Sequence, residues 1–342
     1  MIVFHYDANT NFGDHLNSWL WPALIPELLE KEDDIVLIGV GSIISHSLNI
    51  MPGKKIIFGT GSGYRSLPSP EEVSEWDIYA VRGPLTARAL GLDPKLAITD
   101  GAWLVNNVPK YADLSRDRSG TVFVPHWESM LYGNWETICA KADVTLINPL
   151  DSCDDIFPAL AGAELAIVES LHGAIFADYY GTPWIPVASQ NTISQWKWVD
   201  WCSSLELEYK PYVLPASDYW DAVLRKQPTA IGSANPESIP VPDNMTGFHG
   251  TLQVHNPSAL GQLKNKVKPA LRSMRSSVLE SLKFMRTTRL MNSFNEKRSD
   301  AVSQYFQNLK SGPSFLSTDA VKSEKIERLN AALETMRQNY SG

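Results

Sequence analysis

Residues 170–184 read SLHGAIFADYYGTPW and follow an apolar run at 161–168 that is typical of a buried strand. The stretch predicts a helix that begins near His172, ends at Gly181 and leaves through Pro183. Open α/β sheets bind ligands where a strand gives way to a helix, and the start of a helix favours anions. His172 is therefore either a proton-donating or anion-holding group, or a histidine that only caps its helix beside a packing glycine.

Strand-to-helix changes of the same kind recur on both sides of this stretch. Strands are predicted in the first half at 2–6, 34–39, 54–59, 77–81 and 96–99. A second series starts near residue 120, with strands predicted at 121–126, 144–148 and 163–168 and helices at 135–142 and 155–161. Strands that alternate with helices form parallel βαβ units. The chain is therefore predicted to be an α/β protein with two Rossmann-like domains that face a central cleft.

Composition predicts where these domains begin and end. The first is expected at 1–112 and the second at 120–224, joined by a polar stretch at 113–119. Residues 225–262 are rich in Pro, Gly, Ser and Asn and predict an irregular connection. Residues 263–342 are expected to form a basic helical tail, in which 263–291 carry eight Lys and Arg against one Glu. This tail either lies on an anionic membrane surface or packs on its own domain with a solvated basic face.

Overall composition narrows the partners and the location. The chain has 342 residues and a formal net charge of −8, which argues against a nucleic-acid partner. Its three cysteines show neither metal-ligand spacing nor a disulfide framework, so we expect no metal site and a reducing compartment. Neither a signal peptide nor a membrane-spanning run is evident. We therefore expect a cytoplasmic protein, or one peripheral to the inner face of the cytoplasmic membrane.

Two kinds of polar segment follow the early strands. Asn11 and Asp14 come after the first strand, where Asp14 would hold a substrate hydroxyl or cap the next helix. Glycine-rich turns follow the next two strands, and their backbone N–H groups suit an anion, although tight turns are an equal interpretation. The residues of these turns are Gly41, Ser42, Gly61 and Ser62. Neither turn matches the dinucleotide fingerprint, and neither carries a Walker lysine.

Charged residues at later strand ends complete the candidate set. Arg82 precedes a helix and would clamp a carboxylate or phosphate, or pair with a neighbouring acid. Asp100 is expected on the same rim, as a ligand-binding group or a cap. His126 would face the cleft from the opposite wall, or be structural. Lys197 lies between tryptophans, either as a desolvated cation near His172 or as a stem packed on aromatic rings.

Taken in order, NFGD at 11–14, VRGPLT at 81–86, Asp100 and LHG at 171–173 resemble the polysaccharide pyruvyl transferase family. The segment KWVDW at 197–201 is similar to the branch that decorates bacterial exopolysaccharides. The resemblance implies a GT-B-like fold and a phosphoenolpyruvate-dependent ketal pyruvyltransferase. Such an enzyme moves a pyruvyl group from phosphoenolpyruvate to two hydroxyls of a sugar, which gives a cyclic ketal and releases phosphate. The acceptor is expected to be a lipid-linked oligosaccharide, and no metal or organic cofactor is required.

This chemistry assigns roles within the candidate set. His172 is the expected general acid that protonates the enol-ether methylene, while Asp14 or His126 would orient or deprotonate a hydroxyl. Substrate binding falls to the other candidates, which are Arg82, Lys197, Ser170, Gly173, Asn11, Gly41, Ser42, Gly61, Ser62 and Asp100. Members of the family often have an arginine where this chain has Ser170. Lys197 or another basic residue is expected to replace it.

Two other functions stay open. A nucleotide-sugar-dependent glycosyltransferase of the same architecture would need a ribose-binding acid late in the second domain, for which Glu206 or Glu208 is the candidate. The basic tail suggests a non-catalytic, membrane-proximal assembly partner. The acceptor sugar, its linkage, the ketal stereochemistry and the oligomeric state are not indicated by the sequence.

Overall fold

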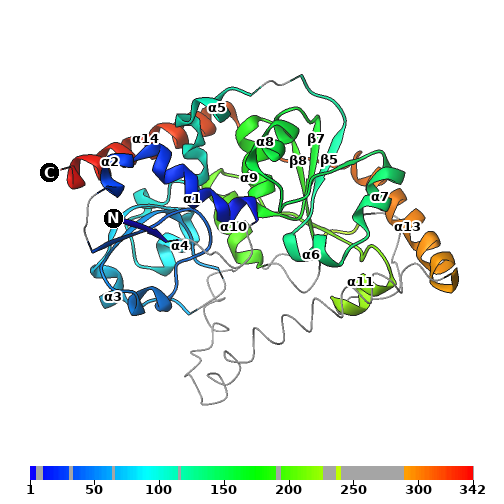
Figure 1. The fold of residues 1–342 in the computed structure, drawn as a ribbon, viewed down its shortest axis with the longest axis horizontal. Coiled ribbons are helices and arrows are strands. Elements are labelled where there is room, and N and C mark those ends of the chain that lie inside the picture. Colours follow the sequence, from blue (N-terminus) through cyan, green and yellow to red (C-terminus); the bar gives the residue numbers. More distant parts are fainter. Residues whose placement is uncertain are drawn as a thin grey trace, which may run out of the picture.

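The computed structural model describes residues 1–4, 11–30, 34–63, 66–114, 117–189, 194–225, 236–239 and 289–341. Two parallel sheets with helices packed around them make up this part of the chain, as Figure 1 shows. The predicted α/β class is therefore confirmed.

The first sheet has the strand order β1-β2-β3-β4, and its neighbouring strands are parallel. Its strands are β1 (Ile2–Phe4), β2 (Ile35–Ile38), β3 (Lys54–Thr60) and β4 (Asp77–Val81). The sequence predicts these four strands, but its prediction of a strand at 96–99 is wrong. Pro94 instead starts the short 3₁₀ helix η2 (Pro94–Leu96). The Asp93 side chain caps this helix by accepting a hydrogen bond from the Lys95 backbone N–H. Only Ala97 then bridges to Val81.

Most helices of this half are formed by segments that are rich in apolar residues or begin with proline. They are α1 (Phe12–Leu24), α2 (Pro26–Leu29), η1 (His46–Ile50), α3 (Pro70–Ser74), α4 (Pro84–Ala89), η3 (Gly101–Asn107) and α5 (Pro109–Ala112). Asn11 is the N-cap of α1, because its Oδ1 accepts hydrogen bonds from the backbone N–H groups of Gly13 and Asp14. The capping role considered for Asp14 therefore belongs to Asn11.

The second sheet has the order β6-β5-β7-β8-β9 and is also parallel. Its strands are β5 (Thr121–Val124), β6 (Thr145–Leu146), β7 (Leu165–Val168), β8 (Trp184–Ala188) and β9 (Tyr212–Val213). Its helices are α6 (Trp127–Tyr132), α7 (Trp135–Ala142), α8 (Cys153–Ala161), α9 (Leu171–Tyr180), α10 (Gln195–Ser204) and α11 (Tyr219–Leu224). The predicted strands of this half are confirmed as the shorter β5, β6 and β7, and the predicted helices as α7 and α8.

Helix α9 has the two ends that the sequence predicts. The Ser170 side chain accepts a hydrogen bond from the backbone N–H of Gly173, and Gly181 ends the helix with a φ of +75°. A Cβ atom on Gly173 would come within 3.1 Å of Val124, so this glycine allows α9 to lie close to β5. His172 consequently stands in the first turn of a helix that starts at a strand end.

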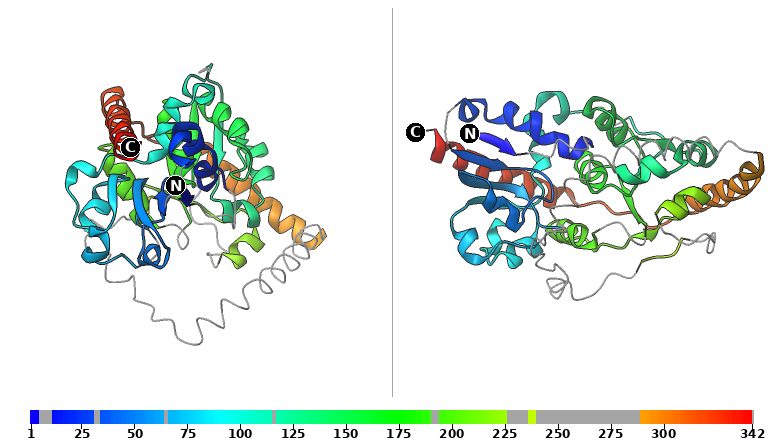
Figure 2. Two further views of the ribbon diagram at one scale, coloured as in Figure 1. Left: turned by 60° about the vertical axis from the view of Figure 1, so that its left-hand side comes forward. Right: turned by 60° about the horizontal axis from the view of Figure 1, so that its bottom comes forward.

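Two helices near the C-terminus pack on different halves of the molecule. Helix α13 (Arg289–Leu309) lies against α7, where Phe306 is fully buried. Helix α14 (Asp319–Tyr340) packs against η3 and β4 of the first half, with Leu329 and Met336 in the core. Figure 2 shows the two helices toward opposite ends of the molecule.

Most of the predicted irregular connection at 225–262 and of the basic segment at 263–291 lies outside the described residues. Among the residues that the structure does describe, no helix combines the length and the apolar character needed to cross a membrane.

The two halves share one hydrophobic core. Phe12 of the first half joins Phe157 and Phe176 of the second, and the centroids of the Phe157 and Phe176 rings are 4.2 Å apart. The indole N–H of Trp103 in η3 donates a hydrogen bond to the Ile175 carbonyl in α9 at 3.0 Å. This packing holds the start of α9 beside the start of α1.

Candidate active site

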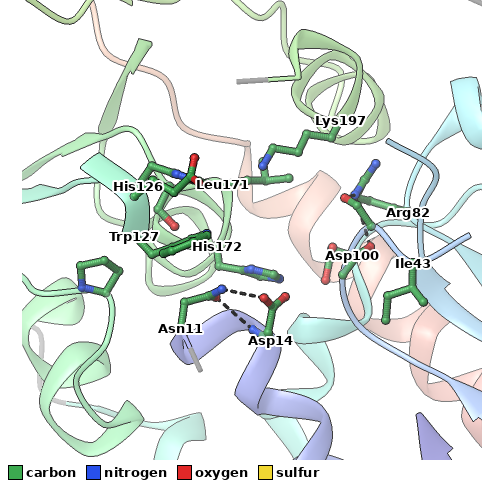
Figure 3. A pocket seen from close by; sticks show the side chains of 15 residues that line it. Asn11, Asp14, Ile43, Arg82, Asp100, His126, Trp127, Leu171, His172 and Lys197 are labelled. Atoms are coloured by element: carbon green, nitrogen blue, oxygen red, sulfur yellow. Dashed lines mark hydrogen bonds between the residues drawn. The ribbon is translucent and has the colours of Figure 1, made fainter. Parts of the chain in front are cut away.

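A pocket with a volume of about 370 Å³ is lined by residues that follow β2, β4, β5 and β7, so both sheets contribute to it. Ligands of α/β proteins bind at the carboxyl ends of strands, and the pocket is large enough for a small molecule. Among its lining residues are the predicted Asn11, Asp14, Gly41, Ser42, Arg82, Asp100, His126, Ser170, His172 and Lys197 (Figure 3). Gly61, Ser62 and Gly173 are not part of this lining.

His172 projects from α9 toward the start of α1. Its Nδ1 lies so close to Gly13 that a Cβ atom there would be 1.9 Å away, and its ring meets Phe12 edge-on at 6.2 Å. Its Nε2 is buried and makes no hydrogen bond within the described structure. Burial lowers the pKa of His172 to about 3, and the charges of Lys197 and Arg82 add to this effect. The imidazole is therefore neutral near pH 7.

Asp14 lies across from His172, as Figure 3 shows. Its Oδ2 accepts a hydrogen bond from Asn11 Nδ2 at 2.6 Å. Burial raises the pKa of the Asp14 carboxyl group, while the Asn11 hydrogen bond and the charge of Lys197 oppose the increase. The pair formed by Asn11 and Asp14 thus places a polar, partly buried carboxyl group on the wall facing the helix start.

Arg82 is fully buried and is held mainly by the glycine-rich turns. Nη1 donates to the Gly41 carbonyl and to Ser42 Oγ, and Nη2 donates to the Ser62 carbonyl at 2.8 Å. Nε has no hydrogen-bond partner within the described structure. The pairing of Arg82 with a neighbouring acid is present, since Asp200 Oδ2 lies 3.3 Å from Nη2, whereas the anion-clamp role stays a prediction.

Asp200 is an important residue that the candidate set misses. It reaches from α10 to the N-terminus of α4, where its carboxylate accepts hydrogen bonds from Thr86 N and Thr86 Oγ1 at 2.9 and 2.6 Å. It also lies 3.3 Å from Arg82 Nη2, and all three residues are fully buried. The KWVDW segment, which contains Asp200, is the sequence feature that could have drawn attention to this residue. However, nothing in the residue spacing predicts its contact with Thr86, 114 positions away.

Asp100 is fully buried at the start of η3, where the charges of Arg82 and Asp200 act on the pKa of its carboxyl group. Its Oδ1 accepts a hydrogen bond from the backbone N–H of Ala102 at 3.0 Å, which caps η3. Its Oδ2 is buried without a hydrogen-bond partner in the described residues, although Asp100 lines the pocket. Asp100 is thus a cap through one oxygen and a pocket group through the other.

His126 forms the opposite wall through a second network that sequence reasoning missed. Its backbone N–H donates to Glu169 Oε2 at 2.9 Å, while Glu169 Oε1 accepts from Ser189 and lies 3.5 Å from Arg225 Nη1. Glu169 is fully buried and directly precedes Ser170. The sequence feature that could have indicated Glu169 is its position as an acidic residue directly after an apolar strand. Burial lowers the pKa of His126 to about 3, with further lowering by Lys197 and Arg225.

Lys197 enters the pocket from α10, between two buried tryptophans. Trp196 Nε1 donates to Ser62 Oγ at 3.1 Å, and Trp198 packs wholly inside the core. Only 9% of Lys197 is exposed, and its charge acts on the pKa values of His172, Asp14 and His126. This position agrees with the desolvated-cation interpretation and places a positive charge near the helix start where Ser170 has none.

Two further lining residues, Trp127 and Glu128, follow His126 at the start of α6. Neither was in the candidate set, and the tryptophan-rich composition is the only sequence signal for the first. Within the described residues, no group of three or more His, Cys, Asp or Glu side chains is arranged to hold a metal ion.

Comparison with known proteins identifies the family. The family model named polysaccharide pyruvyl transferase matches residues 3–191, which is more than half of the chain. The chain is also 38% identical, over 215 residues, to the succinoglycan biosynthesis protein ExoV of Rhizobium meliloti (strain 1021), covering 63% of this chain and 68% of that relative. No solved structure matches it. The match of the family model and the extent of the similarity to the relative together place this chain in the polysaccharide pyruvyl transferase family.

Proposed function

We propose that this protein transfers a pyruvyl group from phosphoenolpyruvate to two hydroxyls of a sugar in an exopolysaccharide or its lipid-linked precursor. The product is a cyclic pyruvate ketal, and phosphate is released. Membership of the family supports pyruvyl transfer, and the relative named for succinoglycan biosynthesis supports an exopolysaccharide acceptor.

One observation supports an anionic donor substrate in particular. Two buried nitrogen atoms, Arg82 Nε and His172 Nε2, lack hydrogen-bond partners in the described residues, and both residues line the same pocket as the buried Lys197. The first turn of α9 also begins there. Phosphoenolpyruvate carries a carboxylate and a phosphate, and fixed cations together with a helix N-terminus suit such groups.

In the proposed reaction, a proton adds to the methylene carbon of the donor, and a sugar hydroxyl attacks the neighbouring carbon. The C–O bond to phosphate then breaks, and the second hydroxyl closes the ring. One hydroxyl proton replaces the proton that was delivered, and the other leaves with the phosphate. No metal or organic cofactor takes part. Asp14 and His126, on opposite walls, would orient or deprotonate the hydroxyls.

His172 is the proposed proton donor, and binding of the donor substrate makes that role feasible. Burial lowers the pKa of His172 to about 3, and the charges of Lys197 and Arg82 contribute to this shift. An anion between these groups offsets their charge and raises the pKa of the imidazole toward its usual range. The acid is thus formed only when there is a substrate to protonate.

The architecture agrees with a GT-B-like arrangement, because residues from both parallel sheets line the pocket. The same arrangement would serve a nucleotide-sugar glycosyltransferase. However, the candidate ribose-binding acids Glu206 and Glu208 are exposed and are not among the pocket-lining residues. The convergence of Arg82, His172 and Lys197 likewise favours an enzyme over a non-catalytic assembly partner.

The lipid carrier and a position on the inner face of the cytoplasmic membrane are part of the proposal. Both rest on the basic stretch at 263–291, of which residues 263–288 lie outside the described structure.

The proposal is tested by titrating phosphoenolpyruvate into the protein and measuring phosphate release with a panel of lipid-linked oligosaccharides. We expect His172→Ala to lower turnover by about 100- to 10,000-fold while the protein stays folded. Lys197→Met should weaken phosphoenolpyruvate binding by at least about 10-fold, since it removes a buried cation. Lys210→Met is the matched control, because Lys210 is exposed and lies outside the pocket lining.

Near-wild-type turnover of His172→Ala would reject the assigned acid. Stabilisation of the protein by nucleotide sugars but not by phosphoenolpyruvate, in a thermal-shift screen, would favour the glycosyltransferase. No turnover with any acceptor, together with no binding of phosphoenolpyruvate, would favour the assembly partner.

A further inference from the structure

The Asp100 carboxyl group has an arrangement that the proposed reaction does not yet use. Its side chain is fully buried, Oδ1 is taken by the Ala102 backbone N–H, and Oδ2 has no partner in the described residues. The backbone beside it is locked, because a Cβ atom on Gly59, which has a φ of +74°, would lie 2.4 Å from the Gly101 Cα. Asp100 is also one of the residues that line the pocket.

The charges around Asp100 do not balance a second carboxylate. Arg82 is the cation beside it in Figure 3, but the Nη2 of Arg82 already lies 3.3 Å from Asp200 Oδ2. Asp200 also accepts hydrogen bonds from the backbone N–H and the hydroxyl of Thr86, so its carboxyl group is already engaged by other donors. Two buried acids thus share one guanidinium, and Arg82 compensates the charge of an ionised Asp100 only in part.

An anionic ligand makes this imbalance worse. The same pocket contains the unused Arg82 Nε and His172 Nε2, which an anion would fill. A carboxylate oxygen facing that anion would repel it in a site of low dielectric constant, whereas a protonated oxygen would donate a hydrogen bond to it.

We propose that Asp100 binds the anionic donor substrate as a neutral carboxylic acid, with the hydroxyl at Oδ2 donating a hydrogen bond into the pocket. This inference rests on the proposed function for the identity of the donor, phosphoenolpyruvate. It assigns Asp100 to recognition of the donor and leaves proton transfer to His172.

The pKa of Asp100 supports this assignment. Burial, with a smaller contribution from Asp200, raises it to about 7 against the opposing effects of Arg82 and the Ala102 N–H group. A substantial neutral fraction is therefore present near pH 7, and a bound anion increases it. The other ionisable groups that line the pocket are Arg82, Lys197, His172, Asp14, His126 and Glu128, and all of them are retained in a variant that changes Asp100 alone.

The test compares phosphoenolpyruvate affinity at pH 7.5 and pH 9.0 by calorimetry. Over this interval the phosphate of the ligand stays ionised, since its second pKa is about 6. Between pH 7.5 and pH 9.0, a group with a pKa of about 7 loses nearly all of its remaining neutral form. This loss should weaken phosphoenolpyruvate binding to the wild type by about 20-fold, in addition to any change that a variant without this group also shows. The comparison protein is Asp100→Asn. Its side-chain oxygen must face the Ala102 N–H, so its NH₂ group occupies the position of Oδ2 and donates at both pH values.

We therefore expect Asp100→Asn to bind phosphoenolpyruvate at pH 7.5 within a few-fold of the wild type and to lack the additional loss at pH 9.0. Asp100→Ala, which has no donor, should bind weakly at both. Parallel pH dependence in the wild type and Asp100→Asn, or equal weakness of Asp100→Asn and Asp100→Ala, overturns the inference.

Failure of the variant to fold and failure of the proposed function can be told apart from failure of this inference. If Asp100→Asn does not fold, the wild type still decides, because an affinity that does not change between pH 7.5 and 9.0 overturns the inference by itself. If the wild type does not bind phosphoenolpyruvate at pH 7.5, the proposed function fails and this inference fails with it. Binding without the pH dependence contradicts the role of Asp100 alone.

Discussion

Replacement of Gly13 by alanine is expected to inactivate the protein through a residue 159 positions away in the chain. A Cβ atom added at Gly13 would lie 1.9 Å from His172 Nδ1, where ordinary contact needs at least 3.4 Å. The imidazole therefore has to move by about 1.5 Å, away from its place beside Phe12. Because misplacement of a catalytic group by about 1 Å can cost about 100-fold in rate, we expect a fall in kcat/KM of at least that size.

The same change should have little effect on folding. An alanine inside a helix is about 0.5–1 kcal/mol more favourable than glycine, which offsets part of the cost of moving the ring. Phosphate release gives the rate, and thermal unfolding gives the stability, with an expected shift in Tm of no more than about 3 °C. Gly91→Ala is the control, since Gly91 has a φ of +67° and open space around its Cα. It should cost about 1 kcal/mol of stability without changing turnover.

A double variant decides whether Gly13 acts through His172. If it does, Gly13→Ala combined with His172→Ala is no slower than His172→Ala alone, because the group that alanine displaces is already absent. Additive losses, or wild-type turnover of Gly13→Ala, would refute the packing argument.

Two further predictions concern stability. Asp200→Ala should lower the free energy of unfolding by about 3–5 kcal/mol in urea titrations, because it removes the buried carboxylate beside Arg82 Nη2 and takes away the acceptor of two Thr86 hydrogen bonds. A loss below about 1 kcal/mol would contradict the buried pair. His126 has its pKa lowered to about 3 in the folded state against about 6.5 when unfolded, so only the unfolded state gains this proton between those values. The free energy of unfolding should therefore fall on acidification through that window by up to about 1.4 kcal/mol per pH unit. Between pH 7 and pH 5, His126→Gln should lose measurably less of this free energy than the wild type. Equal losses in the two proteins would contradict the desolvated histidine.

The sequence predicts those parts of the site that depend on local pattern. Polar residues at or just after the ends of predicted strands, such as Arg82, His126 and His172, do line one pocket, and parallel strands bring their carboxyl ends to one edge within each sheet. The helix start near His172 and the helix end at Gly181 are likewise local features of the chain.

The remaining features depend on contacts between distant residues. Nothing near Asp200 indicates that its carboxylate caps α4, and nothing near Glu169 indicates that it fixes the His126 backbone. The first bond joins the two halves, and the second joins residues 43 positions apart within the second half. The incorrect strand at 96–99 has a local cause, since apolar residues suggested a strand while Pro94 and the Asp93 cap imposed a 3₁₀ turn.

The return of α14 to the first half has a consequence for the order in which the protein folds. Arg337 of α14 bonds to Glu27 and to the Leu24 carbonyl, and Asn330 receives a hydrogen bond from Asn107. During synthesis, the first sheet emerges from the ribosome long before the helix that covers it. Because closing such distant contacts is slow, its apolar surface stays open to solvent until the last turns of α14 have been made. The region that matches the family model, residues 3–191, therefore leaves out a helix whose side chains complete the core of the first half.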